Sequence, residues 1–492
     1  MGLLISQVQF FMLSMIAKCL HHSISAGSRD QRHGSQSCCG DVKQCSQKDT
    51  ELGSWRQCRR DTALSAPGQC LKCKSAAAKV SVRQRERVCW DCFYNQVKTK
   101  VVGTARTKGL IEEGDTVLAA YSGGVGSTSM LHMLACMKSD VVGRKERNKV
   151  SFDLKAVFVD ESAAYGLSGD EASAFRERMQ AACAAAAGGL CQLTVVPLED
   201  VFALDAPVSG QEQSQHLLQE RLRELLEPIR DVTARQDLIY SLRSHLLHHV
   251  AEELRATKLA VGSSATRCAI TTIEWCCKGR GFSLPAAIQY RDMRDGPGHA
   301  VSVLPVRDIG AKELALVCRF KRLPLVPFPL HPSPSQASKS IGSLSARFVA
   351  NLQERLPSSV STILGTSSKL VPFGFNALPE QLIGRRTAPA QGSGSLPLLC
   401  SLCRSPLSDR EIGSAEAVKG GSSQPREVFC NSCSSSVLGP DQAVRDLLPE
   451  VVHRIPQRVA PSAPQGSESN GTAQARATDM LHDRISEFLL DN

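Results

Sequence analysis

The chain has few aromatic residues, no long apolar run and little of the charge pattern of a targeting segment. Aromatic residues make up 5% of its 492 residues, and no run approaches the roughly 20 apolar residues that span a membrane. The apolar stretch near the N-terminus has no positive charge ahead of it, and residues 1–28 contain no arginine. These absences argue against a membrane span, a secretory signal and a mitochondrial presequence. We therefore predict a cytoplasmic protein with no membrane association.

Cysteines are plentiful, at 20 residues, but their spacing is not that of a disulfide framework. Each C-x-x-C pair offers two thiolates from one tight turn, and two pairs complete a tetrahedral site. The eight paired cysteines are Cys70, Cys73, Cys89, Cys92, Cys400, Cys403, Cys430 and Cys433. This arrangement predicts two Cys-four units with structural zinc in a reducing compartment; an iron–sulfur cluster is the alternative that the same ligands admit.

The net charge of +10 is concentrated beside the first Cys-four unit. Residues 72–108 hold ten Lys/Arg against two acidic residues, a net charge of +8. Such density is typical of a surface that binds a polyanion such as RNA, and a solvated face is the alternative. The candidate RNA contacts are Lys72, Lys74, Arg83, Arg85, Arg87, Lys98 and Lys100.

Between residues 114 and about 325, short β-branched runs alternate with helical patterns. The runs are "TVLAAY", "LKAVFVD", "LTVVPL", "KLAVGSS" and "AVSVLPV". Residues 237–256 place leucine or valine four apart on one face of a helix, as an amphipathic helix requires. Apolar strands separated by such helices predict an α/β fold with a parallel sheet covered on both faces.

Composition divides the chain into six parts. Residues 1–66 are predicted to be a disordered or non-native extension. They are followed by a Cys-four zinc unit with a basic flank at 67–98, the α/β domain at 110–330, and a helical extension at 331–365. A low-complexity segment with the second Cys-four unit spans 366–440, and a mostly flexible tail with a short helix at 479–490 spans 441–492.

The turn after the first strand, "YSGGVGSTS", has the form of an anion site. Glycines let the main chain approach a phosphate, and the start of a helix adds positive potential. The turn is not a Walker motif; it resembles the PP-loop of ATP pyrophosphatases, S-G-G-x-D-S, which binds ATP. Ser122, Gly123, Gly124 and Ser127 match that pattern, whereas Gly126 stands at the position of its aspartate. A tight strand-to-helix connection without a ligand is the alternative.

Later motifs resemble the tRNA-thiolating branch of the PP-loop enzymes. Asp160 belongs to a "VDE" at the end of the second strand, and Gly262 opens the turn where that branch has G-H-N-x-D-D-x-A; both become candidate nucleotide contacts. The helix before this turn carries a cysteine pair in the branch. Here the pair is replaced by Gln236 and Ile239, neither of which can carry sulfur.

The order of these motifs is similar to that of the cytoplasmic tRNA 2-thiolation protein 2 family, a degenerate PP-loop group. The resemblance implies a PP-loop domain of the Rossmann-like adenine nucleotide alpha hydrolase type between an N-terminal zinc ribbon and a C-terminal Cys-four unit. It implies a role in 2-thiolation of the wobble uridine (mcm5s2U) of lysine, glutamate and glutamine tRNAs. The implied partners are tRNA, a catalytic PP-loop thiolase in a heterodimer, and a thiocarboxylated ubiquitin-like sulfur carrier.

Two other functions stay open at this point. One is an independently active ATP-dependent tRNA sulfurtransferase or adenylating ligase. The other is a zinc-containing interaction protein that binds no RNA. Because Gly126 replaces the acid and the cysteine pair is missing, we expect a non-catalytic subunit with structural zinc and a degenerate ATP site, and we assign no catalytic residue.

Overall fold

A computed structural model gives the structure of the chain. It describes residues 68–82, 86–143, 150–204, 211–296, 298–329, 339–370, 373, 376, 398–412, 428–439 and 442–453. All of these residues belong to one compact unit. The predictions for residues 1–66 and for the helix at 479–490 lie outside the described residues. Within the described ranges, no helix is both long and apolar enough to cross a bilayer.

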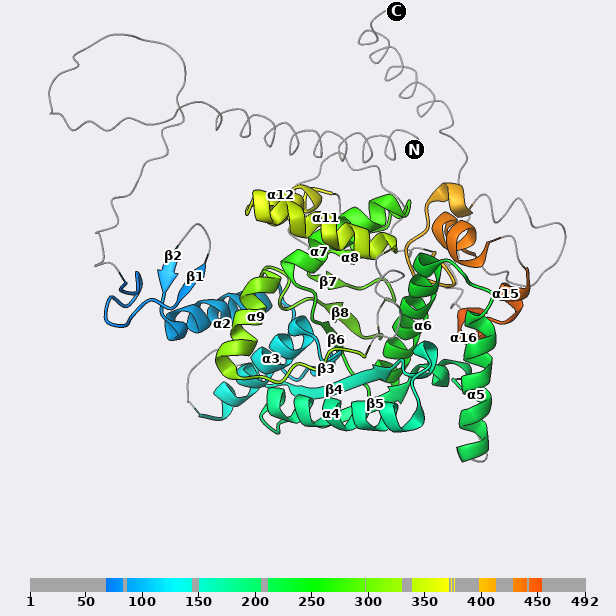
Figure 1. Ribbon diagram of the computed structural model, residues 1–492, viewed down its shortest axis with the longest axis horizontal. Helices are drawn as coiled ribbons and strands as arrows, with labels where there is room; N and C mark the ends of the chain where they lie inside the picture. The colour runs from blue at the N-terminus through cyan, green and yellow to red at the C-terminus, as the bar shows by residue number, and fades with distance from the viewer. Residues whose placement is uncertain are drawn as a thin grey trace, which may run out of the picture. The chain divides into compact units, whose positions relative to one another are not determined.

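A six-stranded sheet forms the centre of the structure, in the order β5-β4-β3-β6-β8-β7 (Figure 1). Its first five strands run parallel, and β7 pairs antiparallel with β8 at the edge. The strands are β3 (Thr116–Ala120), β4 (Asp153–Asp160), β5 (Leu193–Pro197), β6 (Lys258–Val261), β7 (Arg291–Asp292) and β8 (Val301–Val303). The predicted α/β class with a parallel sheet is confirmed, since each of the five apolar runs contains one parallel strand.

Helices cover both faces of this sheet because its central strand is apolar on both sides. In β3, Val117 and Ala119 pack into the cluster formed with α3 (Val125–Gly143), α4 (Gly169–Ala187) and α9 (Ala311–Lys321). Leu118 points to the opposite face and packs against Val250 and Ala251 of α6 (Val232–Glu253). This alternation follows from the two-residue period of a strand.

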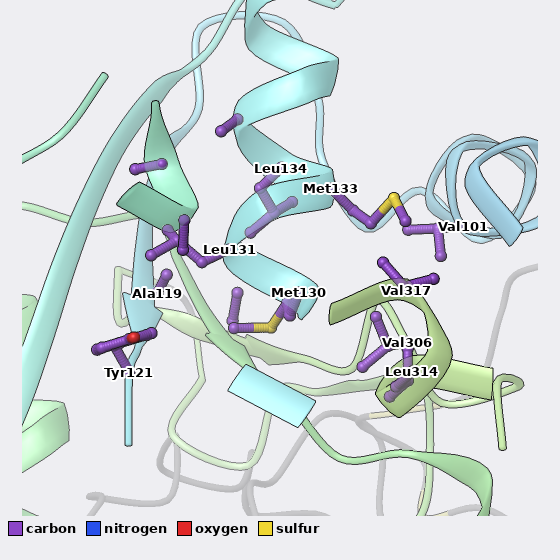
Figure 2. Packing of buried hydrophobic residues seen from close by; sticks show 14 of the residues in the cluster. Val101, Ala119, Tyr121, Met130, Leu131, Met133, Leu134, Val306, Leu314 and Val317 are labelled. Carbon is purple, nitrogen blue, oxygen red and sulfur yellow. The ribbon is translucent and has the colours of Figure 1, made fainter. Parts of the chain in front are cut away.

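Helix α3, which follows β3, contributes several buried side chains to the apolar cluster that contains Val117 and Ala119. Figure 2 shows Met133 of α3 pointing toward Val101 of α2 (Trp90–Thr107), while Leu314 and Val317 of α9 lie beside Val306. The side chain of Met133 is 1% exposed. The helix of the first Cys-four unit thus packs on the α/β domain instead of standing apart from it.

The remaining elements pack around this frame. The first Cys-four unit has a two-stranded antiparallel hairpin, β1 (Val80–Val82) and β2 (Glu86–Val88). A separate apolar cluster joins α7 (Ala265–Cys277), α8 (Leu284–Ala287), α11 (Ile341–Arg355) and α12 (Ser359–Ser367). The other elements are η1 (Ala163–Tyr165), η2 (Leu198–Phe202), α5 (Gln211–Leu226), the π-helical turn η4 (Cys433–Leu438), α15 (Gln442–Asp446) and α16 (Glu450–His453).

Candidate nucleotide site and metal centres

The PP-loop-like turn joins β3 to α3, and hydrogen bonds of the Ser127 hydroxyl to other residues of the turn stabilise it. The Ser127 hydroxyl accepts a hydrogen bond from the Ser122 backbone N–H at 3.1 Å and lies 3.1 Å from the Ser122 hydroxyl. It also donates to the Gly124 carbonyl at 3.2 Å. Gly123 has a φ of +68°, which glycine adopts without steric cost. The structure therefore brings four of the predicted loop residues together, but it uses Ser127 to hold the turn itself.

Gly126, at the position of the family aspartate, lies directly against the turn after β6. A β-carbon added at 126 would overlap the backbone carbonyl oxygen of Gly262. A β-carbon added at Gly262 would lie 2.5 Å from the Ser127 backbone nitrogen, inside the 3.0 Å limit of real contacts. In this backbone geometry the two positions admit only glycine, so an aspartate at 126 does not fit.

The opposite side of the turn is covered by residues 323–329, which follow α9. The Val326 N–H donates to the Gly123 carbonyl at 3.0 Å, and a β-carbon at 123 would lie 2.5 Å from the Val326 carbonyl oxygen. Phe328 packs its ring 5.1 Å from the rings of both Tyr165 and Phe175. Intrachain packing explains the glycines at 123, 126 and 262, whereas a β-carbon at Gly124 would meet nothing closer than 3.7 Å.

The two acidic residues at the end of β4 are held by side chains of this chain. Asp160 is 3% exposed, accepts from the Ser162 backbone N–H at 3.0 Å and pairs with Arg176 at 2.9 Å. Glu161 pairs with Arg243 of α6 at 2.6 Å. Burial raises the pKa of Glu161, although the charge of Arg243 opposes the shift. Asp160, a predicted nucleotide contact, is therefore engaged by Ser162 and Arg176.

The turn after β6 is also held by contacts within the chain. Ser264 caps α7 by accepting from the Arg267 N–H at 3.1 Å, and the Thr266 hydroxyl accepts from the Ala311 N–H at 3.1 Å. Further along, the Glu313 carboxylate accepts from the Gly310 N–H at 2.9 Å at the start of α9. These side chains stabilise helix starts.

The first Cys-four unit brings together the sulfur atoms of Cys70, Cys73, Cys89 and Cys92. All four lie within 4.8 Å of one another, and Cys73 and Cys89 are 3.9 Å apart. Cys70 and Cys73 lie in a turn closed by the Lys74 N–H, which donates to the Cys70 carbonyl at 2.9 Å. The second pair begins α2, where the Cys92 N–H points to the Cys89 sulfur at 3.4 Å. Four thiolates at this spacing could bind a metal ion.

The second Cys-four unit repeats that construction with Cys400, Cys403, Cys430 and Cys433. Its sulfur atoms also lie within 4.8 Å of one another, and Cys403 and Cys430 are 3.8 Å apart. The Arg404 N–H donates to the Cys400 carbonyl at 2.9 Å, and the Cys433 N–H points to the Cys430 sulfur at 3.4 Å. This second set of four thiolates could also bind a metal ion, and all four cysteines are buried.

Contacts with the α/β domain that the sequence did not predict surround the second unit. Arg280 is 4% exposed; it donates to the Ser432 hydroxyl at 3.0 Å and to the Cys433 sulfur at 3.6 Å, and it pairs with Asp237 of α6 at 3.2 Å. His245, also on α6, lies 2.9 Å from the Leu402 carbonyl oxygen. In the sequence, Asp237 and His245 are polar residues within the apolar pattern of α6, which could have indicated a buried contact. Their spacing did not indicate which residues they contact.

Comparisons with known proteins agree with this architecture. The family model described as cytoplasmic tRNA 2-thiolation protein 2 matches residues 340–436. The rice (Oryza sativa subsp. indica) protein of that name is 29% identical over 447 residues, covering 87% of this chain and 90% of the relative. The human protein of that name is 30% identical over 390 residues, covering 68% of this chain and 71% of the relative. The chain belongs to the cytoplasmic tRNA 2-thiolation protein 2 family.

The family predicted from the motif order is thus confirmed. Among solved structures, the chain is similar to the U34-tRNA thiolase NcsA from Methanococcus maripaludis with its [4Fe-4S] cluster. Identity is 18% and the TM-score is 0.41, with 62% of this chain and 87% of that chain covered.

Gln236 and Ile239, which were predicted to stand in place of the cysteine pair, lie on α6. Gln236 is exposed on it, and Ile239 is 2% exposed within an apolar cluster that also contains the second Cys-four unit. Arg243, about one turn beyond Ile239 on α6, pairs with Glu161. One of the two positions predicted to replace the cysteine pair is therefore occupied by a side chain of the apolar core.

The candidate tRNA contacts divide into exposed and partly buried groups. Lys72, Lys74 and Arg87 are exposed, whereas Lys98 and Lys100 are half-buried. The Lys100 ammonium donates to the Asp308 carbonyl at 2.7 Å. Arg83 and Arg85 lie outside the described residues.

Proposed function

We propose that the chain acts in the cytoplasm in 2-thiolation of the wobble uridine (mcm5s2U) of lysine, glutamate and glutamine tRNAs. In this proposal it is the tRNA-binding, non-catalytic subunit of a heterodimer with an active PP-loop thiolase. That partner receives sulfur from a thiocarboxylated ubiquitin-like carrier. The contact of Gly126 with Gly262 supports the non-catalytic assignment, because the Gly262 backbone occupies the space that an aspartate side chain at 126 would need.

The chemistry explains why a partner is needed. Exchange of the uridine C2 oxygen for sulfur requires ATP to convert that oxygen into a leaving group, followed by attack of a sulfur nucleophile. ATP would bring the activating phosphoryl chemistry, but the loop does not fit an ATP–metal complex that depends on a carboxylate at 126. Gln236 and Ile239 supply no thiol for the second step. The catalytic groups must then come from the other subunit.

Binding of tRNA is supported by exposed basic residues on neighbouring elements. Lys72, Lys74 and Arg87 on the first Cys-four unit are joined by Arg319, Lys321 and Arg322 at the end of α9, all of them exposed. The two groups are connected because α9 packs against α2. Lys321 also lies 4.0 Å from the centre of the Tyr94 ring. Exposed cations on two packed elements suit a phosphate backbone.

Zinc is the metal that we propose for both Cys-four units. A tetrahedral zinc ion with bonds of about 2.3 Å places its sulfur ligands about 3.8 Å apart. The separations of 3.9 Å in the first unit and 3.8 Å in the second fit that value. A cluster of several iron atoms would hold its cysteines farther apart. The residues thus fit a single ion that stabilises each fold, and we route no reaction step through it.

The test measures thiolated uridine in cells that lack this protein. Mercury-containing gels retard 2-thiolated tRNA, so the retarded fraction of lysine tRNA reports the modification. We expect the fraction to fall to near zero, to return with the wild-type chain, and to return with Ser122→Ala and Ser127→Ala variants that remain soluble. Normal thiolation without the protein would end the proposal.

Two measurements separate this function from its rivals. An independent sulfurtransferase or ligase predicts exchange between ATP and pyrophosphate by the purified chain, with loss of exchange in Ser122→Ala. A protein-only interaction module predicts no tRNA retention that weakens with salt. We expect no exchange and salt-sensitive retention. In addition, Gly126→Asp should destabilise the chain and restore no exchange, because its β-carbon overlaps Gly262.

A further inference from the structure

A further group of chemically active side chains lies between α2 and α3 and includes none of the eight paired cysteines. The Tyr94 hydroxyl of α2 lies 3.1 Å from His132 Nε2 and 3.5 Å from Cys136 Sγ. His132 and Cys136 are one turn apart on α3, with 3.7 Å between Nε2 and Sγ. The three side chains thus form a closed triangle of donors and acceptors.

The protonation of this triangle follows from the other nitrogen of the histidine. His132 Nδ1 lies 3.4 Å from the Ala186 carbonyl oxygen, which only accepts, so Nδ1 carries the proton of the neutral ring. Nε2 is then the basic nitrogen, and it faces Tyr94 and Cys136. The thiol proton can pass directly to Nε2, which lies 3.7 Å from Sγ. The result is a thiolate beside an imidazolium, with the tyrosine hydroxyl donating to sulfur.

The surroundings favour the charged form of this thiol. Burial raises the pKa of Cys136, but hydrogen bonds from His132 and Tyr94 and the charges of His132 and Lys98 outweigh it and lower the pKa below its ordinary value. By contrast, burial raises the pKa of Cys268 and of Cys276 to about 11.

We propose that Cys136 is a sulfur-accepting thiolate whose substrate class is a persulfide, R–S–SH. The Cys136 sulfur attacks the terminal sulfur of the donor. The donor S–S bond breaks, a new S–S bond forms, and the donor leaves as the thiolate RS⁻, which takes the proton from His132 Nε2. The products are Cys136–S–SH and RSH, and no external oxidant or reductant is consumed. This site is not required by the proposed tRNA-binding function, and it is measured without tRNA or partner.

The first experiment treats the purified full chain with glutathione persulfide and quantifies the added sulfur on each cysteine peptide by mass spectrometry. Cys277 on α7 is exposed and serves as the internal reference thiol. We expect Cys136 to take up sulfur roughly tenfold faster than Cys277. We expect His132→Gln, which removes the base, and Tyr94→Phe, which removes the hydroxyl that donates to sulfur, each to reduce this rate by roughly tenfold. Equal labelling of Cys136 and Cys277 would overturn the proposal, as would variants with unchanged rates.

A second measurement needs no variant and so does not depend on the variants folding. Wild-type chain is alkylated with iodoacetamide between pH 6 and pH 9, and the rate at each cysteine peptide is followed. The rate at Cys136 should reach half its maximum at a lower pH than the rate at Cys277. A midpoint at or above that of Cys277 would contradict the thiolate assignment.

Discussion

Lys74 and Arg404 hold the same place in the two Cys-four units, one residue after the first C-x-x-C pair. Both have left-handed backbone, with φ of 56° and 57°, and both N–H groups close the same turn. Yet Lys74 is exposed, whereas the Arg404 guanidinium pairs with Asp295 at 2.5 Å and its carbonyl accepts from Arg294 at 2.7 Å. The local sequence specifies the turn, whereas the neighbouring residues determine whether the side chain of its cation is exposed to solvent or forms a buried ion pair.

The same contrast holds for the two units as a whole. The first keeps Cys73 exposed and Cys92 half-buried, and it presents lysines and arginines to solvent. The second buries all four cysteines in one apolar cluster with residues of α6. We infer that the first unit serves binding and the second serves stability.

Removal of a metal ligand should give the largest difference between the units. Cys433→Ser should lower the free energy of unfolding by at least about 5 kcal/mol, because a structural zinc site contributes folding energy and this one lies in a core cluster. Cys73→Ser should leave the α/β domain folded. Thermal unfolding, with zinc content measured in parallel, checks both. Similar melting temperatures for the two variants would contradict the assigned roles.

Truncation of the two matched cations should give the next largest effect. Arg404→Ala should destabilise the chain by about 2 kcal/mol, because it leaves the Asp295 carboxylate buried without its guanidinium partner. Lys74→Ala should change stability by less than about 0.5 kcal/mol, since an exposed cation contributes little. Chemical denaturation measures both. The backbone strain is matched, because both substitutions occur at positive φ.

For tRNA affinity, substitutions in the first unit should have a larger effect than substitutions in the second. Lys72→Ala, Lys74→Ala and Arg87→Ala together should weaken binding by roughly tenfold and reduce the slope of log K against log salt by about 2 to 3. Filter binding at several salt concentrations measures the slope. Arg404→Ala, assayed at a temperature where it is folded, is the control and should leave the slope unchanged.

Acid should also weaken the packing around the second unit, by a smaller amount for each group than the Cys433 and Arg404 substitutions above. Burial and the charge of Arg404 lower the pKa of His248 to about 3 and that of His245 to about 4. Since both pKa values are lower in the folded state, this stability is complete above pH 6.5 and is lost as pH falls toward 3 or 4. Each histidine should cost about 1 kcal/mol between pH 7.5 and pH 5.5. His248→Gln should flatten the measured pH dependence; an unchanged profile would refute this assignment.

Local patterns predicted the fold and the two quartets because each depends on short-range order. The strands follow from β-branched runs such as residues 154–160, and each metal unit follows from two turns of fixed spacing. The attachment of the second unit could not be predicted, because Arg280 and Ser432 are far apart in sequence and meet only after the chain folds. The same holds for Tyr94 and Cys136 on separate helices.

The candidate nucleotide site shows a different limit of sequence patterns. Gly126 could be recognised as a missing acid, but its contact with Gly262 depends on how closely two backbones approach. Motif matches at Ser122, Gly123 and Ser127 indicated a ligand-binding loop, whereas the structure uses Gly123 and Ser127 for intrachain contacts. A sequence pattern specifies only residue types, and the same glycines and serines can either bind a ligand or make contacts within the chain.

Residues 323–329 and the Gly126–Gly262 contact together limit which substitutions the turn can accept. An aspartate at 126 would overlap the Gly262 carbonyl oxygen, on a turn that also accepts a hydrogen bond from the Val326 N–H. Under the proposed function, one substitution at 126 therefore cannot give this chain an activity of its own.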